Sequence, residues 1–170
     1  GHFVDVTASL SQQNCQSGTY QPNAGQSSCI DASPGHEINL DYTSQELCRV
    51  GYYQPDSGQQ NCIPSSPGYS VANLGSSTQD GCDPGTYQPN FASSSCIEAS
   101  LGHYVENENA TAQLSCTLGT YQPNYASTSC ILAEPGHWVE SDGASQTQSC
   151  PLGTYGTSVG AVGIETCISA

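Results

Sequence analysis

Aromatic positions recur along the chain at a fixed distance after a glycine, and the segments between them are rich in Ser, Thr, Asn and Gln. The marker glycines follow one another at steps of 17 residues, with a single step of 16: Gly1, Gly18, Gly35, Gly51, Gly68, Gly85, Gly102, Gly119, Gly136 and Gly153. An aromatic residue usually stands two positions later, at Phe3, Tyr20, Tyr53, Tyr87, Tyr104, Tyr121, Trp138 and Tyr155. A fixed period of this kind indicates tandem structural repeats. Ten halves of about 17 residues form five repeats of about 34 residues, at 1–34, 35–67, 68–101, 102–135 and 136–170.

Within each half, the local pattern predicts two short strands joined by a turn. Segments such as Gly-Thr-Tyr-Gln and Ser-Ser-Cys-Ile are short and contain β-forming residues. Gly or Pro interrupts every stretch of helical length, so we expect little or no helix. A marker glycine suits a positive φ or a close approach of two backbones. Pro followed by Asn or Asp is expected at the centre of a turn, at Pro22, Pro55, Pro89 and Pro123.

The halves alternate between two types. A C half contains a pair of cysteines and a run similar to Gly-Thr-Tyr-Gln-Pro-Asn, whereas a Q half resembles Pro-Gly-His-aromatic-Val and ends in Gln-x-x-Cys. Small residues begin the Q halves at Ala32, Ser65, Ala99 and Ala133, and Gln12, Gln45, Gln79, Gln113 or Thr147 stands near the end. The small residue and its partner are 13 or 14 positions apart, much like the cysteine pair. A Q half therefore resembles a C half without its disulfide, and we expect the Gln side chains to hydrogen-bond to nearby backbone instead.

The composition indicates that cross-links replace a large core. Only 35% of the residues are hydrophobic and Met is absent, so the chain buries too little apolar surface to offset the entropy lost on ordering. Ten cysteines at regular spacing are typical of a disulfide framework in an oxidising compartment. Zinc sites usually contain closely spaced cysteines, whereas no two cysteines here are nearer than 14 positions.

Disulfide connectivity is not fixed by sequence alone. Pairing within C halves gives Cys15–Cys29, Cys48–Cys62, Cys82–Cys96, Cys116–Cys130 and Cys150–Cys167. This option closes the shorter loops, whereas pairing across Q halves leaves Cys15 and Cys167 unpaired. We expect small local cores made by each disulfide, its aromatic ring and the following isoleucine: Ile30, Ile63, Ile97, Ile131 and Ile168. The corresponding apolar residues of the Q halves are Val4, Ile38, Val71, Val105 and Val139.

The charge is strongly negative. Arg49 is the only basic residue apart from histidine, against 15 acidic residues, and the net charge is -14. Such a chain lacks the cationic surface that nucleic acids or anionic membranes require. A Ca²⁺ site has little support, because the closest acidic pairs are Glu106/Glu108 and Glu140/Asp142 and no EF-hand spacing is present.

No unique constellation of catalytic residues is present in the sequence. His2, His36, His103 and His137 follow the long period, so in a rod they lie a full repeat apart and are expected to be turn residues. Every candidate nucleophile or acid–base group is either repeated or isolated, whereas an active site is usually one distinct cleft. We therefore expect no enzymatic activity, no cofactor and no bound metal.

The motif Cys-x-x-Gly-Thr-Tyr, with a second cysteine 14 positions after the first, is clearest at Cys82–Cys96 with Gly85 and Tyr87. Together with the following x-x-(Cys or Ala)-x-Pro-Gly, it resembles the ephrin-receptor-like cysteine-rich repeat, which is similar to the modules of tumour-necrosis-factor receptors. The resemblance covers the whole chain. It implies a ladder of short hairpins, disulfides within each loop and an elongated extracellular molecule. The small residues of the Q halves depart from the family, since a cysteine is expected there.

The fold class predicted is small, disulfide-rich and all-β or irregular, with repeats stacked into an elongated rod or solenoid. The function expected is that of an extracellular structural protein forming a rod, stalk or fibre. Both ends of the sequence resemble the repeats and lack a capping unit, which favours head-to-tail continuation with itself. The alternative is a ligand-binding or adhesive ectodomain, for which Arg49, Phe91, Tyr125 and Trp138 are the irregular candidates. Asn109 begins the sequon Asn-Ala-Thr and is a candidate glycosylation site, and the Ser and Thr runs are candidates for O-glycans.

Overall fold

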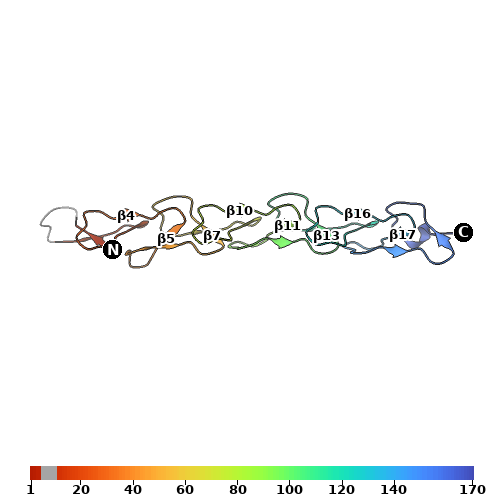
Figure 1. Ribbon diagram of the computed structural model, residues 1–170, viewed down its shortest axis with the longest axis horizontal. Coiled ribbons are helices and arrows are strands. Elements are labelled where there is room, and N and C mark those ends of the chain that lie inside the picture. The colour runs from red at the N-terminus through yellow and green to blue at the C-terminus, as the bar shows by residue number, and fades with distance from the viewer. Residues whose placement is uncertain (5–10) are drawn as a thin grey trace. The chain divides into compact units, whose positions relative to one another are not determined.

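A computed structural model describes residues 1–4 and 11–170 of the chain, which consist of short strands, turns and loops (Figure 1). The residues form two compact units. Unit 1 comprises Gly1–Asp80 and Asn90–Ser95, and unit 2 comprises Gly81–Pro89 and Cys96–Ala170. The predicted division into five repeats follows the sequence period, and stays a prediction.

Unit 1 contains antiparallel hairpins in which each strand has two or three residues. The pairs are β1 (His2–Phe3) with β2 (Gln13–Asn14), β3 (Thr19–Tyr20) with β4 (Ile30–Asp31), β5 (His36–Ile38) with β6 (Gln45–Leu47), and β7 (Tyr52–Tyr53) with β8 (Ile63–Pro64). Strand β9 (Tyr69–Ser70) follows, and β10 (Asp80–Gly81) lies at the boundary of the two units.

Unit 2 repeats the same architecture. Its pairs are β11 (Thr86–Tyr87) with β12 (Ile97–Glu98), β13 (His103–Tyr104) with β14 (Leu114–Ser115), β15 (Thr120–Tyr121) with β16 (Ile131–Leu132), β17 (His137–Trp138) with β18 (Gln148–Ser149), and β19 (Thr154–Tyr155) with β20 (Ile168–Ser169). The last hairpin is longer, and it accommodates a short 3₁₀ helix, η1 (Ile164–Thr166). In the described residues, η1 is the only helix, as the frequent Gly and Pro predicted.

From Gly18 on, each hairpin starts with a tight turn at its marker glycine. In the turn Ser33–His36, the His36 N–H donates to the Ser33 carbonyl at 3.1 Å, and Gly35 has a φ of 77°. Pro at the second position and a positive-φ glycine at the third are typical of a type II turn. The hairpin closes when a later residue, 13 or 14 positions on and 17 in the last hairpin, donates its N–H to the glycine carbonyl, as Cys48 does to Gly35 at 2.8 Å.

The second reversal of each hairpin lies further along than expected. We expected the turn of the C halves at Pro22, Pro55, Pro89 and Pro123, but the positive-φ residues stand three positions later, at Gly25, Gly58, Ala92 and Ala126. The reason is that a glutamine side chain bonds to the backbone beside the proline and holds this segment open, as described below.

Each unit buries only a few apolar side chains. The predicted Q-half residues Ile38, Val71, Val105 and Val139 are buried, with exposed fractions of 1–5%. The prediction for the isoleucines was wrong: Ile30, Ile63, Ile97, Ile131 and Ile168 are 40–50% exposed. Each follows the second cysteine at the start of a two-residue strand, and units built of such short hairpins have too little interior to cover these side chains.

Candidate functional site

The contact between stacked hairpins is the most regular feature of both units. In unit 1, the N–H of Gly51 donates to the Val71 carbonyl in the next half at 2.8 Å, and the Ala92 N–H, two halves along, donates to the Ser65 carbonyl at 2.9 Å. In unit 2, Gly119 donates to Val139 and Gly160 donates to Ala133 at 2.9 and 2.7 Å. Each hairpin is thus hydrogen-bonded to the next hairpin and to the one after it.

The backbone of a turn from a later hairpin packs directly against a marker glycine. We call the surface of the glycine at this contact a socket, and the turn that packs there a docked turn. A Cβ built on Gly18, Gly35 or Gly51 in unit 1 would overlap the carbonyl of a turn two halves further along. The same is true of Gly85, Gly102 and Gly119 in unit 2. Their φ values of 74–87° also disfavour any other residue. Glycine is therefore required at each socket for two reasons. Its own turn has a positive φ, and the backbone packed against it leaves no room for a side chain.

Each unit has very small, buried side chains near these sockets. Ala32, Ser65, Ala99 and Ala133 have an exposed fraction of 0%, as do Cys48 and Cys116 at the corresponding C-half position. Both the N–H and the carbonyl of the residue at this position form hydrogen bonds. In unit 2, the Ala99 N–H donates to the Gly85 carbonyl at 2.8 Å, and its own carbonyl accepts from Ala126 at 2.9 Å.

The Q halves are closed by glutamine. The Oε1 atoms of Gln45, Gln79 and Gln113 accept hydrogen bonds from the backbone N–H groups of Ser33, Ser66 and Ser100, at 2.7–2.8 Å. The predicted replacement of a bridge by a glutamine bond is confirmed at these three positions. Gln12 is exposed, and Thr147 takes the place of glutamine in the last Q half.

The C halves are closed by the five disulfides: Cys15–Cys29, Cys48–Cys62, Cys82–Cys96, Cys116–Cys130 and Cys150–Cys167. Each joins Cα atoms 5.7–5.8 Å apart, within the usual range for disulfides. Together they use all ten cysteines.

The C halves also contain a buried glutamine whose side chain forms two hydrogen bonds to the backbone, which we call the glutamine clasp. The sequence analysis missed this feature. Gln122 is 5% exposed, its Nε2 donates to the Ser129 carbonyl at 2.6 Å, and its Oε1 accepts from the Asn124 N–H at 3.1 Å. Gln21 and Gln54 make the same pair of bonds. The signal was the glutamine directly after Tyr in four C halves, at the position that the Q halves fill with Val or Ile.

The irregular candidates differ in exposure. Trp138 is only 6% exposed, and the Arg49 guanidinium lies 4.2 Å from the centroid of the Tyr52 ring in a cation–π contact. Phe91 in unit 1 and Tyr125 in unit 2 are 65% and 61% exposed, each directly before a positive-φ turn residue. Phe91 and Tyr125 are therefore the exposed aromatic rings among these candidates.

The other predicted residues do not gather into one site. His36 and His103 place Nδ1 at 3.0 and 2.9 Å from the carbonyls of Pro34 and Leu101 in their own turns. Within residues 1–4 and 11–170, no three His, Cys, Asp or Glu side chains are close enough together to hold a metal ion. Asn109 is exposed at a turn with a φ of 58°, and its N–H donates to the Cys82 carbonyl at 2.8 Å.

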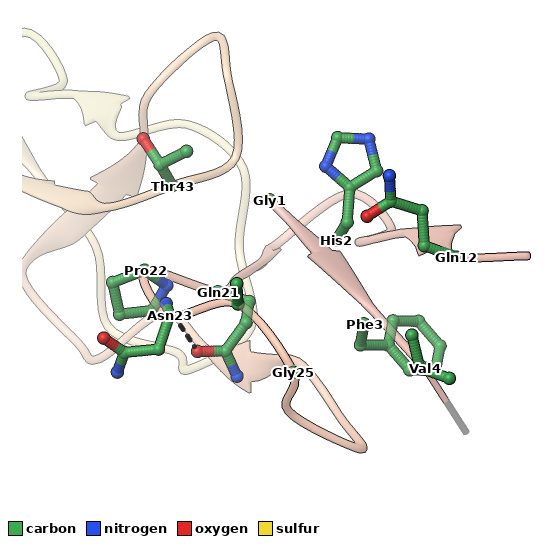
Figure 2. Close-up of a pocket in the computed structure, with 11 residues that line it drawn as sticks. Gly1, His2, Phe3, Val4, Gln12, Gln21, Pro22, Asn23, Gly25 and Thr43 are labelled. Atoms are coloured by element: carbon green, nitrogen blue, oxygen red, sulfur yellow. Dashed lines mark hydrogen bonds between the residues drawn. The ribbon is translucent and has the colours of Figure 1, made fainter. Parts of the chain in front are cut away.

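The pocket in Figure 2 is a shallow depression in unit 1 of about 180 Å³. His2 and Gln12 lie on one side, Pro22 and Asn23 lie on the other, and the Asn23 N–H donates to Gln21 Oε1 at 3.1 Å (Figure 2). Among the described residues, no cysteine or carboxylate lines this pocket. The residues here form hairpin contacts rather than a recognisable catalytic group.

Comparisons with known proteins leave the family open. The chain matches no model of a known protein family, and no curated protein matches it. In the part of the chain that the structure describes, no helix is both long and apolar enough to cross a bilayer. The five intrachain disulfides are typical of extracellular or secreted proteins.

Proposed function

We propose that this chain is an extracellular structural protein, an elongated spacer or stalk built from serially stacked hairpins that can continue head to tail. The observation that carries the proposal is the backbone bonding from each hairpin to the next two within each unit. Contacts of this kind are local along the sequence and can be extended without limit, which is how solenoid proteins form long rods.

The surface chemistry supports the same role. A net charge of -14 keeps neighbouring molecules apart and resists collapse of an extended chain. Cross-links in every second half keep the hairpins closed without a large core. The proposal includes no enzymatic activity and no cofactor.

Small-angle X-ray scattering of the oxidised, monomeric chain tests the shape. A compact globule of 170 residues has a radius of gyration of about 15 Å, and we expect a value well above this with the distance distribution of a rod. The reduced chain in denaturant is the control, because an unfolded chain is also large but has no constant cross-section. A radius near the compact value would contradict the proposal.

A second candidate function is adhesion, supported by the exposed rings of Phe91 and Tyr125 at equivalent turns of two C halves. Exposed aromatic residues are enriched at protein interfaces. Loss of a captured extracellular partner in the variant F91S/Y125S, with unchanged scattering, would favour this candidate over a purely structural role.

A further inference from the structure

Asn109, the first residue of the sequon Asn-Ala-Thr, is a turn residue of a Q half in unit 2. Its φ of 58° lies in the left-handed region, which asparagine adopts more readily than most residues. Oligosaccharides are attached to sequons that lie on the surface of secreted proteins. The way in which this turn presents its side chains therefore decides whether the sequon fits a glycan.

The backbone of the sequon is held by the preceding C half. The Asn109 N–H donates to the Cys82 carbonyl at 2.8 Å, and the Ala110 carbonyl accepts from the Gln88 N–H at 3.0 Å. Cys82 and Gln88 are only 1% and 5% exposed. The backbone of residues 109 and 110 is thus bonded to buried residues of a neighbouring hairpin.

The two side chains that define the sequon are exposed. Asn109 and Thr111 both lie at the surface of unit 2. Within the part of the chain that the structure describes, neither the Asn109 amide nor the Thr111 hydroxyl has a hydrogen-bond partner. A glycan on the amide nitrogen of Asn109 therefore requires no change in the backbone bonds of the turn.

Ala126 has the same position in the C half that follows. It is exposed with a φ of 52°, its N–H donates to the Ala99 carbonyl at 2.9 Å, and the Ser127 carbonyl accepts from the Val105 N–H at 2.9 Å. Thr128 stands two positions later and is exposed, so Ala126→Asn alone completes a sequon. This turn differs from the Asn109 turn in its side chains and matches it in its backbone bonds.

The disulfides next to the turn favour the route on which N-glycans are added. Cys82, which accepts the Asn109 hydrogen bond, is itself bridged to Cys96, and Cys116 is bridged to Cys130 in the following C half. Such bridges form in oxidising compartments of the secretory route. A chain that acquires them there meets the lipid-linked oligosaccharides that serve as glycan donors.

We propose that Asn109 carries an N-linked glycan, and that its turn is a position at which the repeat displays glycans. The amide nitrogen of Asn109 forms a bond to the anomeric carbon of the first sugar of a lipid-linked oligosaccharide. The bond from that carbon to the lipid diphosphate breaks, the diphosphate leaves with the electron pair, and the amide nitrogen releases one proton. The proposal goes beyond the structural function and requires only that the chain enters the secretory route.

Mass spectrometry of the protein purified from its natural source tests the modification. We expect a mass above that of the oxidised polypeptide, and we expect it to fall on treatment with peptide N-glycanase, which converts a glycosylated asparagine to aspartate. Peptide mapping should place this conversion at Asn109. A natural protein with an unmodified Asn109 would overturn the proposal.

Variants secreted from a glycosylating eukaryotic host test the sequon. Thr111→Ala and Asn109→Gly should each lose the glycan, and glycine already occupies the equivalent turn at Gly143, so Asn109→Gly should fold like the parent. Thr111→Ser is the matched control and should keep the glycan, because either hydroxyl residue completes a sequon. A glycan that persists in Thr111→Ala and Asn109→Gly would contradict the assignment to Asn109.

The display position is tested in the same host with Ala126→Asn, which should gain a second glycan. The matched control is Ala126→Asn with Thr128→Ala, which should carry only the first. Ala92→Asn, which completes Asn-Ser-Ser at the equivalent turn of unit 1, covers the case in which Ala126→Asn fails to fold. Folded Ala126→Asn or Ala92→Asn with a single glycan would overturn this part of the proposal.

The two proposals fail in different measurements. An unmodified Asn109 leaves the scattering test of the structural function unaffected. A compact scattering profile of a chain glycosylated at Asn109 would instead overturn the structural function and leave the modification in place.

Discussion

The hairpins of the C halves and the Q halves close the same loop with different chemistry. In unit 2, the C half has Cys116 bonded to Cys130, whereas the preceding Q half has Ala99 and a hydrogen bond from Ser100 to Gln113. In both, the first position of the pair is fully buried, its N–H closes the hairpin that precedes it, and its carbonyl accepts a hydrogen bond from a later turn. The backbone bonds therefore define the repeat, and the closing chemistry sets how strongly each hairpin resists opening.

We expect the largest change in the free energy of unfolding when a disulfide is removed. Cys116→Ala with Cys130→Ala should lower the free energy of unfolding of unit 2 by about 3 kcal/mol, because a loop of this length is no longer restricted in the unfolded chain. Urea denaturation followed by tyrosine fluorescence measures it. An unchanged midpoint would mean that the bridge adds no stability to unit 2.

The buried glutamine of the C halves has the next largest effect. Gln122→Val introduces the residue type that the Q halves carry at this position, but it leaves the Ser129 carbonyl and the Asn124 N–H without their side-chain partner. We expect the free energy of unfolding to fall by about 2 kcal/mol, because these backbone groups are left unpaired. Val105→Ile, a change at the equivalent Q-half position, is the control for altered packing. A Gln122→Val variant as stable as the parent would refute the role of the clasp.

We also expect that a disulfide can be introduced into a Q half. Ala99→Cys with Gln113→Cys places cysteines at the positions that correspond to Cys82 and Cys96, and we expect a sixth disulfide that raises the free energy of unfolding by about 1–2 kcal/mol. The gain is smaller than the loss above because the Gln113 bond is removed. Intact mass with and without alkylation detects the bridge. Two free thiols in the folded protein would show that the halves differ in geometry.

The smallest effect is expected for the glutamine closure of the Q half. Gln113→Ala removes one hydrogen bond to the part-buried Ser100 N–H and should cost about 1 kcal/mol. Gln148→Ala, in the exposed strand β18, is the matched control and should have no measurable effect. A loss as large as that from removing a disulfide would reverse the ranking of the two closures.

The hairpins and the closing bonds within a half could be predicted from the sequence, whereas the buried glutamines of the C halves and the contacts between halves could not. The hairpins and the Gln45, Gln79 and Gln113 bonds follow from spacing within a half. The docking of a turn on a glycine two halves away uses backbone groups only, so no side-chain pattern marks it. The isoleucines were assigned to a core because of their residue type, whereas the two-residue strands leave them half-exposed.

Amide hydrogen exchange measured by NMR tests the central claim, that stacking bonds rather than the closing chemistry define the repeat. The N–H groups of Asn109 and Gly143, turn residues of Q halves, donate across unit 2 just as that of Ala126, a C-half turn residue, does. We predict that all three exchange slowly, with similar protection, and that the N–H of Gly25 exchanges fast. Protection confined to the disulfide-closed halves would contradict the account.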